Sequence, residues 1–407
     1  MIIGLEDHAH IRTRGTDEAM DIQAFRPIAV CGEASARESI EVPMGRTPMA
    51  AALAVTIMIS QAVGGPVFAD AGPARPNWGT ERSELISGAD YDKSKGICRA
   101  LGVPVAPAGD MPTPAQRAAL GECRSEPLYY GEGKAVDYDA ARLCAFGEAQ
   151  GADDQTFGGS TILMQIYANG LGVPRNLDLA TAYACQLQGA PAESDARVLH
   201  LQALKAPPGE AKADGRPVEP FDYCNDVTSG WAGSECEARD STLASFARDA
   251  KVAALEAHIP QTARSSYHRL REALEAFIEM HADGEVDQTG SGRAGFVIEE
   301  QDAVRDQFVS DLELLLSGDW PVAGATAARD AVAHLNASYR RILAWAASGA
   351  NMSTIHPDAI RNTQRAWLVY RDAFKRFAAA ASPGTGRDAL LARLTNLRNA
   401  QLDRMPV

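Results

Sequence analysis

Cysteine is confined to the first 236 residues of this 407-residue chain, and this distribution limits the possible folds more than any other feature. The seven positions are Cys31, Cys98, Cys123, Cys144, Cys185, Cys224 and Cys236. None of them forms a Cys-x-x-Cys pair or a cysteine–histidine cluster with the spacing of a zinc site, so we expect no metal. Because an even set of cysteines in an oxidising compartment pairs up, we predict three disulfides among the last six, provided that Cys31 is removed.

An apolar stretch between residues 44 and 72, MGRTPMAAALAVTIMISQAVGGPVFADAG, gives the reason for removing Cys31. Its apolar run is shorter than the ~20 residues of a membrane-spanning helix. Arg46 precedes the run and Ala69-Asp70-Ala71 follows it, as in a secretory signal peptide. We predict a signal peptide over 44–71, cleavage after Ala71, a periplasmic or secreted protein, and no transmembrane span in the mature form. Residues 1–43 are then an extension from a start codon placed too far upstream; a disordered extension is the alternative.

Apolar residues recur at spacings of three and four along most of the mature chain, and alternation with period two is rare. This pattern predicts an all-α protein. The mature chain is long for one core, so we expect two domains with a helical connector. We divide it into a repeat domain over 72–210, a disulfide loop and helical connector over 211–318, and a helical domain over 319–407.

Two segments resemble each other: YYGEGKAVDYDAARLC, which ends at Cys144, and YANGLGVPRNLDLATAYAC, which ends at Cys185. The spacing of 41 residues between these cysteines fits a helix-turn-helix repeat. In each copy glycine ends one helix, and we expect Asp137 and Asp178 to cap the next.

The second copy resembles the SEL-one-like family of tetratricopeptide-related repeats. The residues that match the family pattern are Tyr167, Gly170, Gly172, Val173, Ala180 and Ala182. The first copy departs from the pattern, with Ala135 in the place of the second glycine. The resemblance covers about residues 90–205 and implies a short array of helix-turn-helix units.

Chain order and the apparent equivalence of the repeats favour three cysteine pairs among fifteen possible arrangements. The predicted pairs are Cys98–Cys123, Cys144–Cys185 and Cys224–Cys236. The last is the safest, because its two cysteines bracket a short Gly- and Ser-rich loop.

The last ninety residues contain two helical segments with clear apolar stripes, AVAHLNASYRRILAW and IRNTQRAWLVYRDAFKRF, and a third segment completes a predicted antiparallel bundle. This part resembles the LprI-type lysozyme inhibitor domain family. We predict a binding site from its motif residues and the neighbouring basic residue Arg340: the motif residues are Asn336, Tyr339, Gln364, Arg365, Trp367, Arg371 and Asp372. Many family members carry cysteines near these motifs, whereas this chain has none after Cys236.

Two interpretations of these motif residues remain open. Buried amide and guanidinium groups are costly unless paired, so the residues can form a polar network that locks two helices together. We favour this lock. Alternatively, the side chains converge on an open groove and contact a ligand.

Charge is divided unevenly along the mature chain. Residues 320–407 contain twelve basic and five acidic side chains, whereas residues 72–319 contain 22 basic and 39 acidic ones. Lysozymes are typically basic, so only the acidic part would attract one electrostatically. The basic part, including Arg340 and Arg365, suits an anionic wall polymer. The acidic balance and the predicted export argue against nucleic-acid binding.

Two further patterns are set aside. GSGRAG at 290–295 has the glycine spacing of a dinucleotide-binding loop, but no strand precedes it. The segment that carries His281, Asp283, Glu285 and Asp287 lacks the spacing of a calcium-binding EF-hand loop, so we interpret it as a solvated turn.

No nucleophile motif or cofactor motif is evident, and we predict a protein that is not an enzyme and binds no cofactor. The leading hypothesis is an exported envelope protein that binds or inhibits a cell-wall hydrolase such as lysozyme. The alternative is a repeat-based interaction scaffold of the periplasm with no link to lysozyme.

Overall fold

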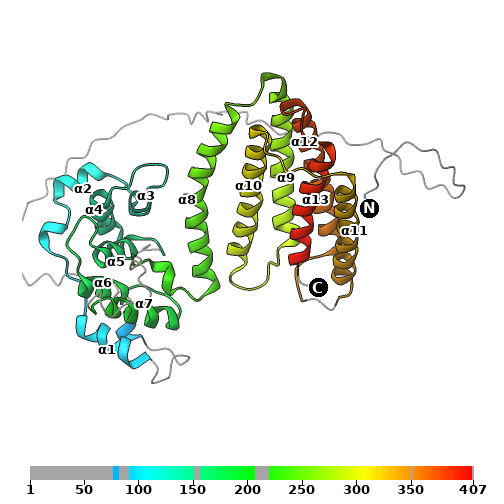
Figure 1. Ribbon diagram of the computed structural model, residues 1–407. Helices are drawn as coiled ribbons and strands as arrows, with labels where there is room; N and C mark the ends of the chain where they lie inside the picture. Colours follow the sequence, from blue (N-terminus) through cyan, green and yellow to red (C-terminus); the bar gives the residue numbers. More distant parts are fainter. Residues whose placement is uncertain (1–76, 82–90, 151–155, 207–219, 350–351, 406–407) are drawn as a thin grey trace, which may run out of the picture. The chain divides into compact units, whose positions relative to one another are not determined.

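The computed structural model describes residues 77–81, 91–150, 156–206, 220–349 and 352–405. Throughout these residues the secondary structure is helical and there is no strand, which confirms the predicted all-α class (Figure 1). None of the described helices is long and apolar enough to cross a membrane. The predicted signal peptide and upstream extension lie outside the described residues.

Among the described residues, seven α-helices and two short 3-10 helices, Trp78–Thr80 and Ala108–Asp110, build an N-terminal region. The α-helices are α1 (Asp92–Leu101), α2 (Pro114–Leu120), α3 (Ser125–Tyr130), α4 (Tyr138–Glu148), α5 (Gly159–Asn169), α6 (Leu177–Ala184) and α7 (Pro191–Ala203). Helix α5 is its centre, because ten of its eleven residues are buried and it packs against both α4 and α6. The fully buried side chains of Ile162, Leu163, Met164 and Ile166 belong to one hydrophobic cluster that extends to Cys236.

The α3–α4 and α5–α6 pairs have matching turns. Gly131 and Gly170 follow α3 and α5 in the left-handed conformation, with φ of 77° and 70°. Gly133 and Gly172 repeat this conformation two residues later, with φ of 66° and 69°. Glycine adopts such positive φ values without the strain that a side chain would add. The true counterpart of Gly172 is therefore Gly133, and the assignment of that place to Ala135 is wrong.

The N-caps of α4 and α6 give the same alignment. The side chain of Asp137 accepts a hydrogen bond from the Ala140 N–H, and that of Asn176 accepts one from the Leu179 N–H. The expected cap at Asp178 is wrong, because Asp178 lies inside the first turn of α6. Asp137 to Asn176 and Gly131 to Gly170 are both steps of 39 residues. Cys144 and Cys185, 41 residues apart, are consequently not equivalent positions.

The described residues form three disulfides, Cys98–Cys185, Cys123–Cys144 and Cys224–Cys236. The prediction for Cys224 and Cys236 is confirmed, whereas Cys98–Cys123 and Cys144–Cys185 are wrong. Bonded cysteines need Cα atoms within about 7 Å, so packing decides the pairs and sequence order does not. Helix α1 packs against α6 and α7, which brings Cys98 to Cys185 at a Cα distance of 5.6 Å. Cys123 lies two residues before the first residue of α3, and α3 packs on α4, which carries Cys144.

Six long helices build a C-terminal bundle. They are α8 (Gly230–Glu256), α9 (Arg264–Glu285), α10 (Arg293–Ser317), α11 (Ala325–Ala347), α12 (Pro357–Ala381) and α13 (Arg387–Arg404). The closest packing pairs are α9 with α12, α11 with α13, and α8 with α10 (Figure 1). Tyr267 meets Phe377 and Phe277 meets Tyr370, so α9 and α12 run antiparallel.

The core of this bundle joins α9 and α10 to the three last helices. Phe277 and Phe308 lie in the same hydrophobic cluster as Leu335, Trp367 and Leu402. Helix α12 packs mainly on α9, which precedes the segment expected to form the C-terminal domain. The C-terminal motif is therefore positioned by a helix that lies about eighty residues earlier in the chain.

Candidate functional site

The two motif helices place the predicted site residues in different environments. On α11, Tyr339 is buried, Asn336 is half-buried and Arg340 is exposed. On α12, Gln364 and Trp367 are each only 2% exposed, whereas Arg365 is exposed. Arg371 and Asp372 are half-buried. The described structure thus does not bring all eight residues together in one open site.

Arg371 forms a local contact on α12. Its guanidinium donates to Asp372 Oδ1 from Nε at 3.0 Å and from Nη2 at 2.8 Å. The same guanidinium lies over the Trp367 ring, 5.4 Å from the ring centroid. The Arg371 side chain thereby packs over an aromatic ring that is buried in the core, and its guanidinium makes a cation–π contact with that ring. This geometry gives Arg371 a role in packing.

Gln364 contacts a residue that lies outside the predicted site. Its Oε1 accepts a hydrogen bond from Nε of Arg398 on α13 at 3.1 Å. The side chain of Arg398 is fully buried. A buried guanidinium requires charged or polar partners on each of its edges, and Gln364 satisfies one of them.

Glu285 at the end of α9 is the counter-ion of Arg398. Arg398 Nη1 donates to Glu285 Oε2 at 2.7 Å, and Nη2 donates to Oε1 at 2.5 Å. This two-bond geometry is the one in which guanidinium and carboxylate fit best. Gln401 accepts a further hydrogen bond from Nη1 at 3.1 Å. The pair therefore ties the C-terminal end of α9 to the middle of α13 inside the core.

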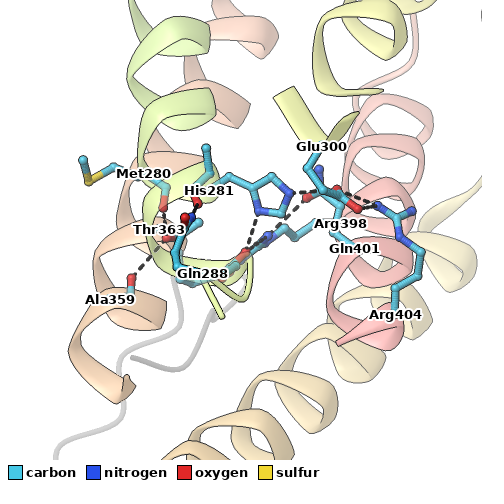
Figure 2. A network of polar contacts seen from close by, with 12 residues as sticks. Met280, His281, Gln288, Glu300, Ala359, Thr363, Arg398, Gln401 and Arg404 are labelled. Atoms are coloured by element: carbon cyan, nitrogen blue, oxygen red, sulfur yellow. Dashed lines mark hydrogen bonds and ion pairs between the residues drawn. The ribbon is translucent and has the colours of Figure 1, made fainter. Parts of the chain in front are cut away.

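His281 lies one turn before Glu285 and extends the network to α10. Its Nδ1 is 2.9 Å from Glu285 Oε2, and its Nε2 is 3.1 Å from Oε2 of Glu300. Glu300 in turn accepts two hydrogen bonds from Arg404, at 2.9 and 3.1 Å. One continuous set of charged side chains therefore links α9, α10 and α13 (Figure 2). We call His281, Glu285, Glu300, Arg398 and Arg404 the buried charge network.

The electrostatics of the network follow from this pairing. Burial raises the pKa of Glu285, but Arg398 and His281 outweigh this and hold the pKa at about 2, below the ordinary 4.5. The hydrogen bond from His281, against a smaller effect of burial, likewise holds the pKa of Glu300 below its usual value. Both carboxylates are therefore ionised at neutral pH.

Helices α9 and α12 approach each other closely beside the network. Gly284 on α9 has no side chain, and a Cβ there would lie 2.8 Å from Oγ1 of Thr363. Thr363 uses this space to donate to the backbone carbonyl of Met280 at 2.6 Å (Figure 2). The sequence therefore needs glycine at 284 to seat α12 against α9, next to Gln364.

The interpretation of residues 281–287 as a solvated turn is wrong for His281 and Glu285. Both lie in the last turns of α9 and are buried, with exposed fractions of 4% and 5%. The signal for their pairing was the spacing of four residues, which places two side chains on one helix face. The described residues contain no group of His, Cys, Asp or Glu side chains arranged to hold a metal ion.

The arrangement of the network suits a structural role, in which its ion pairs hold α9, α10 and α13 together. Each charged group has an opposite charge within hydrogen-bonding distance, and the innermost ones are shielded from solvent. Charged groups that are fully paired in this way specify which helices pack together, and breaking one pair is strongly destabilising. Gln364 contacts this network through its hydrogen bond with Arg398.

The chain matches no protein-family model, and comparisons with characterised proteins and with solved structures find no significant relative. The resemblances to SEL-one-like repeats and to the LprI-type domain therefore stay predictions from the residues.

Proposed function

We propose that this protein is an exported, non-catalytic binding protein of the cell envelope whose partner is a cell-wall hydrolase such as lysozyme. Export is supported by the three disulfides, because such bonds persist mainly in oxidising compartments. A binding role is supported by the resemblance of α11 and α12 to the LprI-type domain. Periplasmic or secreted localisation belongs to the same proposal.

The observation that carries the proposal is a row of exposed carboxylates on α9. Glu272, Glu279 and Asp283 are exposed and lie seven and four residues apart, so they share one face of the helix. None of the three has an ion pair with another described residue. A free acidic face attracts a basic protein and accelerates its association.

The surroundings of this row strengthen the electrostatic attraction. Residues 220–319, which include α8, α9 and α10, contain twenty acidic and eight basic side chains. Residues 320–407 have the opposite balance, twelve basic and five acidic. A basic hydrolase is accordingly expected to bind on α9 and to avoid the exposed arginines Arg340 and Arg365.

A matched pair of variants tests the proposal. Glu272→Lys with Glu279→Lys changes the α9 row, and Glu122→Lys with Asp330→Lys makes the same charge change at two exposed positions elsewhere. Titration calorimetry with lysozyme at low salt should show about tenfold weaker binding or more for the α9 variant, and nearly wild-type binding for the control. The proposal is refuted if the wild-type protein does not bind lysozyme. Equal weakening by both variants would remove α9 as the site.

A second candidate function is an interaction scaffold built on the N-terminal region, without lysozyme. The observation that favours it is a pair of apolar side chains in the connection after α1: Val103 is 71% exposed and Val105 is 84% exposed. Exposed apolar side chains close together are typical of a protein-binding surface. Under this alternative, Val103→Ser with Val105→Ser abolishes capture of an envelope partner, and the α9 variant leaves capture unchanged.

A further inference from the structure

The imidazole of His281 has a carboxylate oxygen at each of its two nitrogens. Nδ1 is 2.9 Å from Glu285 Oε2 and Nε2 is 3.1 Å from Glu300 Oε2. An ionised carboxylate can only accept hydrogen bonds, and a neutral imidazole has a single N–H to donate. Both contacts are therefore hydrogen bonds only when the ring carries two protons and a positive charge.

The charges around His281 come from three helices. Glu285 lies on its own helix α9, Glu300 on α10, and Arg398 and Arg404 on α13. Helix α12 also packs on α9. Its group in this arrangement is the neutral side-chain amide of Gln364, which accepts a hydrogen bond from Arg398. With His281 charged, three positive groups meet two negative ones, and with His281 neutral the two signs balance.

Glu300 holds α10 through this arrangement. Its carboxylate is 28% exposed and has two kinds of partner, the ring of His281 and the guanidinium of Arg404. Arg404 is itself 56% exposed. Because a solvent-exposed ion pair contributes little stability, the partly buried hydrogen bond to His281 is the stronger of the two attachments.

We propose that His281 is a pH-dependent clamp that fastens α10 to α9 while both of its ring nitrogens carry protons. Loss of the Nε2 proton removes the hydrogen bond to Glu300, and the pair with Arg404 is then the ion pair that Glu300 keeps among the described residues. The proton leaves to solvent, and no other group is consumed. The clamp is independent of the identity of any binding partner.

The direction of the pH effect follows from the folded pKa. Burial lowers the pKa of His281, but hydrogen bonds from its ring to Glu285 and Glu300 outweigh burial and raise it above the ordinary 6.5. A group whose pKa is raised on folding adds stability that is fully present below its unfolded pKa. That stability is lost as the pH rises through the raised value. The clamp is therefore closed below the ordinary pKa of 6.5 and opens as the pH rises through the raised pKa of His281.

Histidine-selective ¹⁵N NMR of the full chain tests the clamp directly. The chain has eight histidines, so their ring signals can be resolved, and His281→Gln identifies the one that belongs to residue 281. At pH 6.5 both ring nitrogens of His281 should carry protons, and the midpoint of its titration should lie above 6.5. In Glu300→Gln, which removes one carboxylate at a partly exposed position, the midpoint should move down by about one unit or more.

A matched control and a second measurement keep the test decisive. His334 on α11 is 54% exposed and pairs with Asp403, so its ring signal is the internal control for changes that are not local to His281. Hydrogen exchange, corrected for intrinsic rates, should show protection in α10 falling several-fold between pH 6.5 and 9 in the wild type and much less in Glu300→Gln. If His281→Gln does not fold, the signal of His281 is assigned by replacing the other histidines one at a time with glutamine. A neutral His281 ring at pH 6.5, or an unchanged midpoint in Glu300→Gln, would overturn the proposal.

Discussion

Two fully buried arginines, one in each region, are held in opposite ways. In the C-terminal bundle, Arg398 donates hydrogen bonds to Glu285, Gln364 and Gln401. In the N-terminal region, none of the three guanidinium nitrogens of Arg197 has a hydrogen-bond partner among the described residues. Its guanidinium lies over the ring of Tyr223 instead, 4.3 Å from the centroid.

The difference matches the way in which each region is held together. The N-terminal region and the start of α8 contain all three disulfides, whereas no described residue after Cys236 is cysteine. Covalent bonds constrain the unfolded chain, so this region tolerates a buried charge that is only partly compensated. The bundle has no such bonds, and its helices are selected by apolar packing and by the buried charge network. Disulfides and paired charges thus perform the same task in different halves of one chain.

The largest effect is expected from the longest disulfide loop. Cys98→Ser with Cys185→Ser opens a loop of 87 residues. The loop-entropy estimate for that length is a loss of about 4 to 5 kcal/mol from the free energy of unfolding. Removing Cys224–Cys236, which spans 12 residues, should cost about 3 kcal/mol by the same estimate. Urea unfolding of both variants checks the order, and equal losses would show that loop length does not govern stability here.

Breaking the network should have nearly as large an effect on the bundle. Glu285→Gln leaves Arg398 buried without a counter-ion, and such a change costs about 3 to 5 kcal/mol. Glu275→Gln is the control, because Glu275 lies on the same helix and is exposed. The control should stay within about 0.5 kcal/mol of the wild type. A Glu285→Gln protein as stable as the control would contradict the role of the network.

Acid should weaken the bundle through the same carboxylate. The pKa of Glu285 is held at about 2, below the ordinary 4.5. A lowered pKa contributes stability that is present above the unfolded value and is lost as the pH falls through the folded value. The difference in melting temperature between wild type and Glu285→Gln should therefore narrow as the pH falls from about 4.5 toward 2. A difference that stays constant over this window would mean that Glu285 is not charged in the fold.

The smallest effects concern the two motif arginines. Arg371→Ala removes a contact over Trp367 and the pair with Asp372, and should cost about 1 kcal/mol. Arg365→Ala changes an exposed side chain and should stay within about 0.5 kcal/mol. We expect both variants to bind lysozyme with normal affinity per folded molecule. Unchanged stability with lost binding in both would instead make these arginines ligand contacts.

Local properties of the chain were predictable from its sequence. Helical periodicity gave the all-α class, and the short spacing of Cys224 and Cys236 gave their disulfide. The glycines of the two turns were also recognisable in the sequence, but we aligned the two repeat segments by Cys144 and Cys185 and not by these glycines. Aligning Gly131–Gly133 with Gly170–Gly172 would have given the period of 39 and removed the argument for Cys144–Cys185.

Contacts between residues far apart in the sequence were not predictable, and the buried charge network depends on such contacts. Glu285 and Arg398 are 113 residues apart, and no local pattern connects them. Gln364 was selected from the LprI-type resemblance, but its partner Arg398 lies on the third helix, to which that resemblance assigned no role. The two groups meet only in the packed bundle, where Glu285 at the end of α9 pairs with Arg398 on α13.

The central claim is that disulfides stabilise the N-terminal region and paired charges stabilise the C-terminal bundle. Hydrogen exchange of the full chain, measured with its disulfides intact and again after reduction, tests this claim most directly. Reduction should strip protection from α4, α5 and α6, whose region relies on Cys98–Cys185 and Cys123–Cys144. Protection in α9, α12 and α13 should stay within about twofold of the oxidised protein, because the buried charge network and the apolar core there are unchanged. A comparable loss of protection in α9, α12 and α13 would contradict the account.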